Sequence, residues 1–417
     1  MYIIYTLIFC FITYRVFKIK GLCPSTFLLS LFALSSISMF VLHFIYHSGN
    51  RSFIEDYNSG LLFLLCALLI FLMPFIDIRD DSVKSIMIPK PTISYSIEWL
   101  SIFLSIISII YFTPIALKML SSGMDNIAEL RSLVANGEHP FIERSLLNTI
   151  SGTAATFYII PLFFFFVECT RNSKITFKAN LLFISSLSYA IFVLAYLGRD
   201  GLLFWSFSFI AIFLLFKKFI RKSNRKSILK YFLRILIVFV CIFMVISIAR
   251  FATKSYTDSE SGNVILSLFS YLGQGPINFS EFFYLDIKTM DYGRNMFPLL
   301  FGDRIEGVVY SESYGLNSWV FKTFIYPIWS GFGTVLTLVI GLSLFTIYKC
   351  TFKKDRASKK YSFSFVLCYF LFFQIYSQGV FYFRMYNMVG NLFILVLLTM
   401  ILVFKFVPQE SIVKTLK

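Results

Sequence analysis

The sequence predicts an all-α protein that crosses a membrane many times, and two observations carry this prediction. Of the 417 residues, 58% are hydrophobic and only 14% are charged, a balance that excludes a water-soluble domain. The apolar residues form runs of about 18 to 25, the length that a helix needs to cross roughly 30 Å of hydrocarbon. We therefore expect a single transmembrane domain over residues 1–417 with about eleven helices, in a range of about ten to twelve.

The spans follow from the positions of the apolar runs. The first run has its charges behind it and no small-residue cleavage site, so we interpret it as a retained helix and not as a signal peptide. Tight turns separate the hairpin at 179–216, which turns on YLGRDG, and the last pair, which turns on Arg384 to Asn387. The predicted spans are 1–17, 22–46, 60–78, 93–118, 150–168, 179–197, 201–216, 231–249, 327–348, 362–382 and 386–406.

The distribution of Lys and Arg predicts the orientation, because positively charged loops stay in the cytoplasm. The loops that start at Arg15, Arg79, Arg171, Lys217 and Lys349, with the tail from Lys405, hold 26 of the 38 basic residues. The N-terminus is therefore expected outside and the C-terminus inside. The net charge of +16 follows this pattern and does not indicate nucleic-acid binding.

Two predicted outer loops, 119–149 and 250–326, are much longer than a turn, and loops of that length usually carry function. In the first, Ile127, Leu130 and Leu133 to Val134 have helical spacing, which predicts an amphipathic helix at the interface. In the second, Gly273, Gly275 and Pro276 are expected to break an apolar stretch into short helices. We expect these to fold back as a lid or wall over a cavity.

Soluble-enzyme motifs and metal-ligand clusters are missing from the sequence, so no metal and no cofactor are expected. His43 and His47 share one helix end, and without a third ligand they are interpreted as part of an interfacial helix face. All seven cysteines fall in spans or on the cytoplasmic side, so no outer disulfide is expected.

Arginines on the predicted outer face are the remaining candidates for chemistry. Arg199 lies in the turn LGRDG between two apolar helices, where Gly198 and Gly201 are expected to leave its guanidinium presented and not buried. Arg250 and Arg384 are predicted at the same depth. Three guanidiniums at one level suit a pyrophosphate, which accepts paired hydrogen bonds from each. Alone, each would more simply contact lipid headgroups.

At this point the chain resembles the O-antigen polymerase family of bacterial inner membranes. The resemblance rests on the Phe-, Ile- and Leu-rich spans, the two long outer loops, the LGRDGLL turn, and SYLGQGPINFSEFF followed by GRNMFPLLFGD. It implies a membrane glycosyltransferase that joins oligosaccharide repeat units carried on undecaprenyl pyrophosphate at the outer leaflet, in O-antigen or capsule synthesis. It also implies a partner that regulates chain length. Related ligases carry a histidine in the long loop; the second outer loop here has none, which favours a polymerase.

The residues expected to carry the reaction follow from this chemistry. Departure of the pyrophosphate places negative charge on an oxygen, and arginines stabilise that charge. Either a carboxylate acts as the base for the acceptor hydroxyl, or the arginines act without a base. Expected catalytic residues are Arg199, Arg250 and Asp200, with Glu281, Asp303 and Glu306 as other possible bases. Expected substrate-binding residues are Arg131, Arg294, Arg304, Arg384 and Glu281. The aromatic residues Phe279, Phe282, Phe283 and Tyr284 either stack on sugars or serve packing, and packing is the more common role.

Two other functions stay open. A different polyprenyl-dependent glycosyltransferase would use an acidic pair in the first outer loop, and Glu55 with Asp56 fits that pattern. A flippase or other transporter of lipid-linked oligosaccharides would show internal repeats and charges paired within its helices. Glu98 is the acid that we place well within a span, and no repeat is visible.

Overall fold

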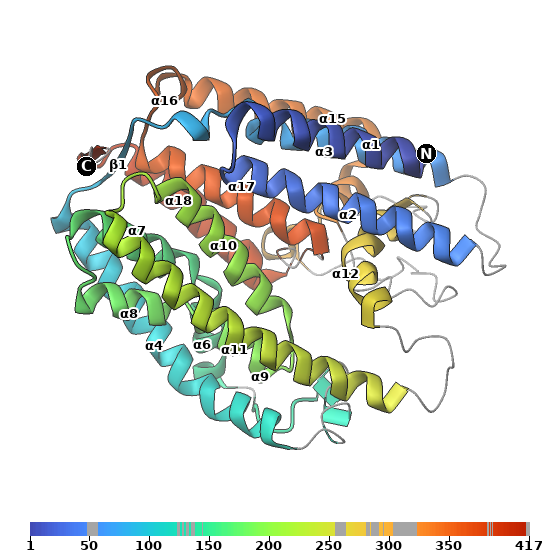
Figure 1. Cartoon of the computed structure of the whole chain (residues 1–417), viewed down its shortest axis with the longest axis horizontal. Coiled ribbons are helices and arrows are strands. Elements are labelled where there is room, and N and C mark those ends of the chain that lie inside the picture. The colour runs from blue at the N-terminus through green and yellow to red at the C-terminus, as the bar shows by residue number, and fades with distance from the viewer. Residues whose placement is uncertain are drawn as a thin grey trace. The chain divides into compact units, whose positions relative to one another are not determined.

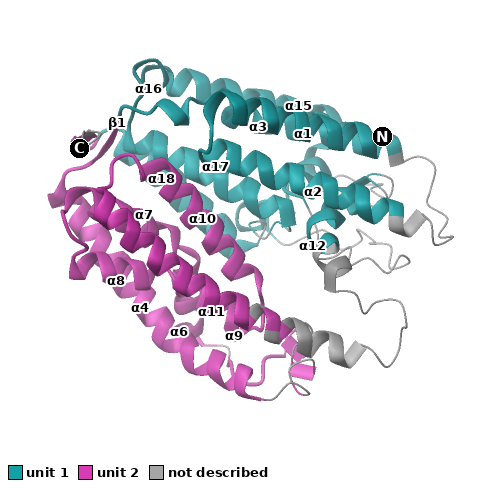
Figure 2. Cartoon of the chain, viewed as in Figure 1, with its two compact units in different colours: residues 1–84, 264–406 teal, residues 85–263, 407–417 magenta. Residues whose placement is uncertain are grey.

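The protein is described here from a computed structural model, which is almost entirely helical (Figure 1). Contacts within the chain divide it into two compact units, residues 1–84 with 264–406 (unit 1) and residues 85–263 with 407–417 (unit 2) (Figure 2). The structure describes residues 1–47, 57–122, 126, 129–130, 133–134, 138–143, 145–254, 264–280, 284, 292–294, 296–302, 323–381, 383, 385 and 387–413.

Unit 1 is built from helices that begin and end close to the predicted apolar runs. Its long helices are α1 (Tyr2–Lys20), α2 (Pro24–His47), α3 (Tyr57–Asp77), α15 (Ile325–Thr351), α17 (Phe363–Phe381) and α18 (Met388–Phe404). Shorter elements are a 3-10 turn (Asp80–Ser82), α12 (Val264–Asn278), α14 (Pro298–Phe301), α16 (Lys353–Ser358) and β2 (Lys360–Tyr361).

Unit 2 contains the long helices α4 (Pro91–Ser121) and α11 (Lys222–Lys254) and the apolar helix α10 (Asp200–Phe216). Two further predicted spans are each divided in two, into α6 (Leu146–Thr156) with α7 (Ile159–Arg171), and α8 (Phe177–Ser185) with α9 (Ser188–Ala195). The strands β1 (Ser85–Pro89) and β3 (Gln409–Val413) pair antiparallel, with Ser85 opposite Val413 and Pro89 opposite Gln409.

The helices confirm a membrane protein. Within the described residues, seven helices are long and apolar enough to cross a membrane, and an eighth if the bent pair α6 and α7 is one span. That pair bends by 46°. The apolar helices α10 and α18 are 17 residues each, and the predicted span 231–249 lies inside α11.

Side chains from α10 form hydrogen bonds with polar side chains near the junctions of these helix pairs. At the α6 to α7 break the backbone switches to tighter i to i−3 hydrogen bonds, and the Tyr158 hydroxyl lies 2.9 Å from Ser208 Oγ. At the α8 to α9 break, Trp205 Nε1 donates to Ser186 Oγ at 3.0 Å. Because hydrocarbon offers no hydrogen bonds, a helix can break there only where protein groups take over.

Glycines let helices of unit 1 pack closely. A Cβ on Gly341 of α15 would lie 2.8 Å from Ile70 and Phe71 on α3, and one on Gly273 of α12 would lie 2.5 Å from the backbone of Met39 on α2. The expected break at Gly273, Gly275 and Pro276 is wrong, because α12 continues to Asn278. Gly273 serves close contact with α2 here, and the packing of α12 against α2 compensates the low helix propensity of the glycines.

Candidate functional site

The turn between α9 and α10 carries the predicted residues Arg199 and Asp200. The α9 helix ends in a Schellman motif: the Gly198 N–H donates to Val193 O at 2.9 Å and the Leu197 N–H to Leu194 O at 2.9 Å. Leu197, not the neighbouring glycine, takes the left-handed backbone conformation, with φ 50°. A β-carbon at that φ costs about 1 kcal/mol, and such strain concentrates at functional sites.

The two glycines bring this turn against α9. A Cβ on Gly198 would lie 2.6 Å from Val193 Cγ1, and one on Gly201 would lie 2.6 Å from Val193 Cβ. The consequence corrects the sequence-based expectation: Arg199 is buried, with 8% of its surface exposed, and is not presented to solvent. Charge in a dry environment acts more strongly on a neighbouring group than charge in water does.

Asp200 is the first residue of α10 and is also 8% exposed. A carboxylate in the first helical turn interacts favourably with the helix dipole. This placement is a structural role for Asp200 that does not require it to act as a base.

A hydrophobic cluster formed with residues of α4 and α11 packs against the turn between α9 and α10. Leu197 and Leu202 of the turn pack with Phe112 and Met119 near the end of α4 and with Ile246 of α11, among other buried residues. Arg250 follows Ile246 by four residues, one helical turn along α11. The backbone of Arg250 therefore lies near the turn that carries Arg199, although its side chain lies outside the described residues.

The first predicted outer loop also reaches this cluster. Leu130 and Val134 pack against it, while Glu129, directly before Leu130, is exposed. This pattern confirms the predicted amphipathic spacing at these two positions.

His139, which the sequence did not single out, connects the same loop to the end of α9 through hydrogen bonds. Its Nδ1 accepts from the Phe141 N–H at 3.1 Å, so Nε2 carries the proton and donates to Ala195 O at 2.9 Å. Its ring stands edge-on to Tyr196 at 4.9 Å. Burial lowers the pKa of His139 below its ordinary value of 6.5, opposed by the hydrogen bond to Ala195. The histidine therefore binds the backbone at Ala195, four residues before Arg199, in its neutral form.

The other predicted site residues are placed less completely. Arg294 is described and exposed, in a turn of unit 1. Asn391, buried in the first turn of α18, ties that region together: its Nδ2 donates to Met296 O at 2.9 Å and to Met385 O at 3.0 Å. Outside the described residues lie Arg131, Arg304, Arg384, Glu281, Glu55, Asp56, Asp303 and Glu306. The predicted set of Arg199, Arg250 and Arg384 stays a prediction.

The aromatic residues of the second outer loop show packing where they are described. Phe279 is fully buried and lies 6.0 Å from Phe63 and 5.3 Å from Trp329, ring centre to ring centre. Tyr284 stacks on Trp329 at 5.3 Å. Phe279 therefore serves packing, as the commoner interpretation expected, while Phe282 and Phe283 lie outside the described residues.

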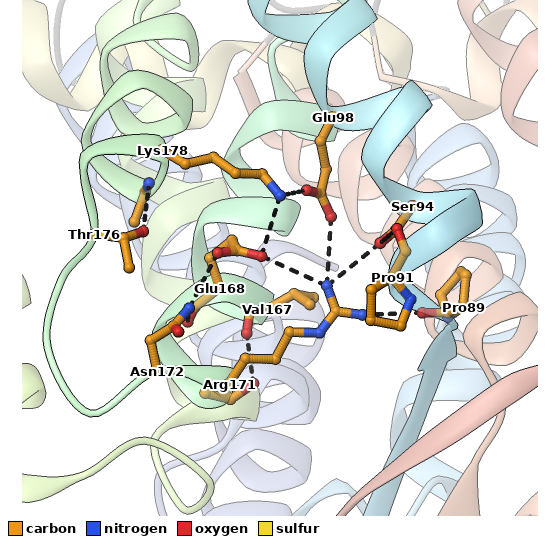
Figure 3. A network of polar contacts seen from close by, with 12 residues as sticks. Pro89, Pro91, Ser94, Glu98, Val167, Glu168, Arg171, Asn172, Thr176 and Lys178 are labelled. Carbon is orange, nitrogen blue, oxygen red and sulfur yellow. Dashed lines mark hydrogen bonds and ion pairs between the residues drawn. The ribbon is translucent and has the colours of Figure 1, made fainter.

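A buried ion-pair network lies at the opposite end of α4 (Figure 3). Arg171, the last residue of α7, lies 3.5 Å from both Glu98 and Glu168, and Lys178 pairs with the same two acids. The chain builds this network locally, because Thr176 caps α8 by accepting from the Ala179 N–H, and the short turn thereby brings Arg171 and Lys178 together.

Arg171 also anchors the β1 and β3 strands. Its guanidinium donates to Pro89 O at 3.0 Å and to Glu410 at 2.9 Å, and Ser94 accepts a further bond at 3.3 Å. The network thus explains the buried acid Glu98, and its partners come from far along the chain, where a sequence pattern does not reveal them.

The length of α4 gives the distance between the ion-pair network and the turn that carries Arg199. Glu98 pairs in the network, and Met119, 21 residues later, packs in the cluster that contains Leu197. At 1.5 Å per residue this is about 30 Å, the thickness of the hydrocarbon core. The two polar sites of unit 2 therefore lie about one membrane thickness apart along α4.

Within the described part of the chain, no group of three or more His, Cys, Asp or Glu side chains is arranged to hold a metal ion. The expected independence of metals remains a prediction. Comparisons with known protein families, with characterised proteins and with solved structures found no match to this chain.

We predict that Glu98→Gln lowers the melting temperature of the purified protein by several degrees. The change leaves Arg171 and Lys178 short of a buried anion, and breaking a buried pair from one side costs about 3–5 kcal/mol. The matched variant is Glu410→Gln, whose side chain is 40% exposed against 0% for Glu98. It should cost less than about 1 kcal/mol. Equal, small effects of both changes would show that the network does not stabilise unit 2.

A second prediction concerns pH. Since the folded protein lowers the pKa of His139, the contact made by the neutral ring is fully present above pH 6.5 and is lost as the pH falls through the lowered value. Protonated Nδ1 can no longer accept from Phe141. Hydrogen exchange in residues 138–143, corrected for its intrinsic pH dependence, should show lower protection at about pH 5 than at about pH 7.5. His139→Gln should remove that difference; a difference that persists would assign it to another group.

Proposed function

We propose that this protein is a membrane glycosyltransferase that polymerises oligosaccharide repeat units carried on undecaprenyl pyrophosphate. The proposal rests on the resemblance of the LGRDGLL turn and the long-loop segments to the O-antigen polymerases. The observation that supports it most is the strained turn that buries Arg199 and Asp200 together. A guanidinium in such a dry site acts more strongly on a developing negative charge than one in water does.

The proposal includes a topology of eleven spans in a bacterial inner membrane, with the N-terminus outside and the C-terminus inside. In the described part of the chain, seven helices, or eight with the bent pair, are long and apolar enough to cross a membrane, and α10, α11 and α18 overlap the other three predicted spans. The network at Arg171 and Lys178 then lies at the cytoplasmic side, and the turn at Arg199 lies at the outer side, about 30 Å away along α4.

In the proposed reaction, an acceptor hydroxyl of one repeat unit displaces the pyrophosphate from the anomeric carbon of another. Arg199, with Arg250 on the neighbouring helix, stabilises the charge that develops on the departing phosphate oxygen. Asp200 receives the proton of the acceptor hydroxyl or orients Arg199. His139 acts through Ala195 by holding the first outer loop at the turn.

Expected binding partners are the lipid-linked oligosaccharides, membrane lipids and a regulator of chain length, with no nucleic acid. Arg131, Arg294, Arg304, Arg384 and Glu281 remain proposed substrate contacts. The exposure of Arg294 is compatible with such a contact.

A transporter of lipid-linked oligosaccharides is the second candidate, and one observation favours it. The bent pair α6 and α7, with the kink at Gly333 in α15, resembles the discontinuous helices of transporters. The surface glycan of a deletion strain separates the two functions. A strain without the polymerase carries a single repeat unit on each lipid core, whereas a strain without the transporter carries none.

In a deletion strain complemented with variants, Arg199→Ala should lower the polymerisation rate about a hundredfold, the loss of about 3 kcal/mol of transition-state stabilisation. Arg199→Lys should be nearly as damaging, because an ammonium lacks the paired donors of a guanidinium. The matched control is Arg221→Ala, an exposed arginine between α10 and α11, which should leave polymer length unchanged. Full-length polymer from both Arg199 variants, at normal protein level, would refute the proposed role of the turn.

A further inference from the structure

The helix α11 packs on unit 2 with one face and is exposed on the opposite face. On the packed face, the ring of Phe232 is buried and lies 4.5 Å from that of Phe209 on α10. At the start of the helix, the Asn224 side chain donates to Asn172 O at 3.1 Å, directly after the end of α7. Figure 2 shows α11 along the front of unit 2. Its first turns therefore lie at the same end of unit 2 as the ion-pair network, because Arg171 ends α7.

Four cations form a row on the exposed face, and we call them the basic stripe. Its members are Lys222, Lys226, Lys230 and Arg234, and all four side chains are exposed. They follow one another at i, i+4 spacing, so they lie one above another on a single face of the helix. Like charges at this spacing repel each other and destabilise a helix. An anion bound along the stripe would relieve this repulsion.

The chain does not neutralise the basic stripe itself. The four side chains form no hydrogen bond or ion pair with any residue that the structure describes. The sequence has no acid between Asp200 and Asp258, and the acids outside the described residues all fall in the predicted outer loops. By contrast, the ion-pair network at the same end of unit 2 pairs both of its cations with acids. The stripe is therefore left for an anion from outside the chain.

The basic stripe continues into the apolar part of the helix. Arg234 lies three residues inside the predicted span 231–249, about 5 Å along the helix axis. The same exposed face carries Leu233, Ile237 and Val240, and each of these side chains is more than half exposed. An arginine at that depth extends toward the lipid headgroups, where phosphate oxygens match its paired donors.

The positive-inside pattern does not by itself require this arrangement. It requires cations in the connection between α10 and α11, and Lys217, Lys218, Arg221 and Arg225 already supply them. It sets neither the face of the helix on which a cation lies nor a cation inside the apolar span. The row that ends at Arg234 therefore needs an explanation of its own.

Cations that lead into exposed apolar side chains fit an anionic phospholipid. Its phosphate group pairs with the ends of the basic side chains, and its acyl chains lie along the apolar residues of the same face. A soluble anion would use only the cations. A zwitterionic phospholipid carries an ammonium group that opposes the attraction of its phosphate to the stripe.

We propose that the exposed face of α11 binds an anionic phospholipid of the membrane. Lys226, Lys230 and Arg234 hold its phosphate group, and Leu233, Ile237 and Val240 contact its acyl chains. This site goes beyond the proposed reaction, because it concerns a lipid of the surrounding membrane and holds for a polymerase and a transporter alike.

The test measures the affinity of the full chain in detergent micelles for phosphatidylglycerol and for phosphatidylcholine by native mass spectrometry, with each lipid titrated separately. Phosphatidylglycerol should bind at least about thirtyfold more tightly. Lys230→Gln combined with Arg234→Gln should weaken its binding about thirtyfold, since each cation near an anionic headgroup contributes about fivefold. Binding of phosphatidylcholine should stay unchanged.

The matched control is Lys353→Gln combined with Lys354→Gln, which removes two exposed cations from α16 and changes the net charge equally. It should keep the affinity of the wild type for phosphatidylglycerol. Both double variants should fold, because the positions are exposed and Gln has nearly the helix propensity of Lys and Arg. Phosphatidylglycerol should raise the melting temperature of the wild type and of the control more than that of the stripe variant.

Three outcomes would overturn the proposal. Equal affinity for the two lipids would show that the stripe does not select an anion, and wild-type affinity in the stripe variant would place the lipid elsewhere. Equal losses in the stripe variant and the control would assign the effect to net charge. Displacement of the lipid by inorganic phosphate, at constant ionic strength, would assign the stripe to a soluble anion. Because the readout is lipid binding, none of these results depends on whether the protein polymerises glycans.

Discussion

The structure depends on one constraint: backbone and side-chain polar groups inside hydrocarbon must find partners within the protein. Unbroken helices such as α4 meet it without help. At the α6 to α7 break of unit 2 the backbone pairs its own groups through i to i−3 bonds. The side chains of α10 pair with polar side chains beside these positions, Ser208 with Tyr158 and Trp205 with Ser186, so these polar residues are partnered within the protein.

The same constraint governs the charges. In unit 2 the buried charged residues gather in two places, the network around Glu98 and Arg171 and the turn with Arg199 and Asp200. The network has cations and anions in direct contact, which is what a structural cluster requires. At the turn, a strained Leu197 and two tightly packed glycines hold the backbone beside Arg199 in place. Strain combined with a buried charge is the stronger indication of function.

The long apolar helices were predictable because apolar run length is a local property of the sequence, and most of them begin and end within a few residues of the predicted limits, although α11 begins at Lys222, nine residues before the predicted span 231–249. The breaks were not, since Tyr158 and Ser186 look like ordinary span residues until α10 is placed beside them. The burial of Arg199 was predicted wrongly, because the contact of Gly198 with Val193 depends on how the chain returns on itself. His139 could have been noticed as a histidine in a long outer loop, but its partner at Ala195 is 56 positions away.

In the topology that we propose, the Arg199 turn lies on the outer side of the membrane and the Arg171 network on the cytoplasmic side. Topology reporters fused to the chain test it most directly, with one fusion after Lys226, following the α10 to α11 connection, and another near Gly137 in the first long loop. The proposed topology predicts a cytoplasmic signal from the first fusion and an extracytoplasmic signal from the second. An extracytoplasmic signal from the fusion after Lys226 would place the turn in the cytoplasm and contradict the proposed topology.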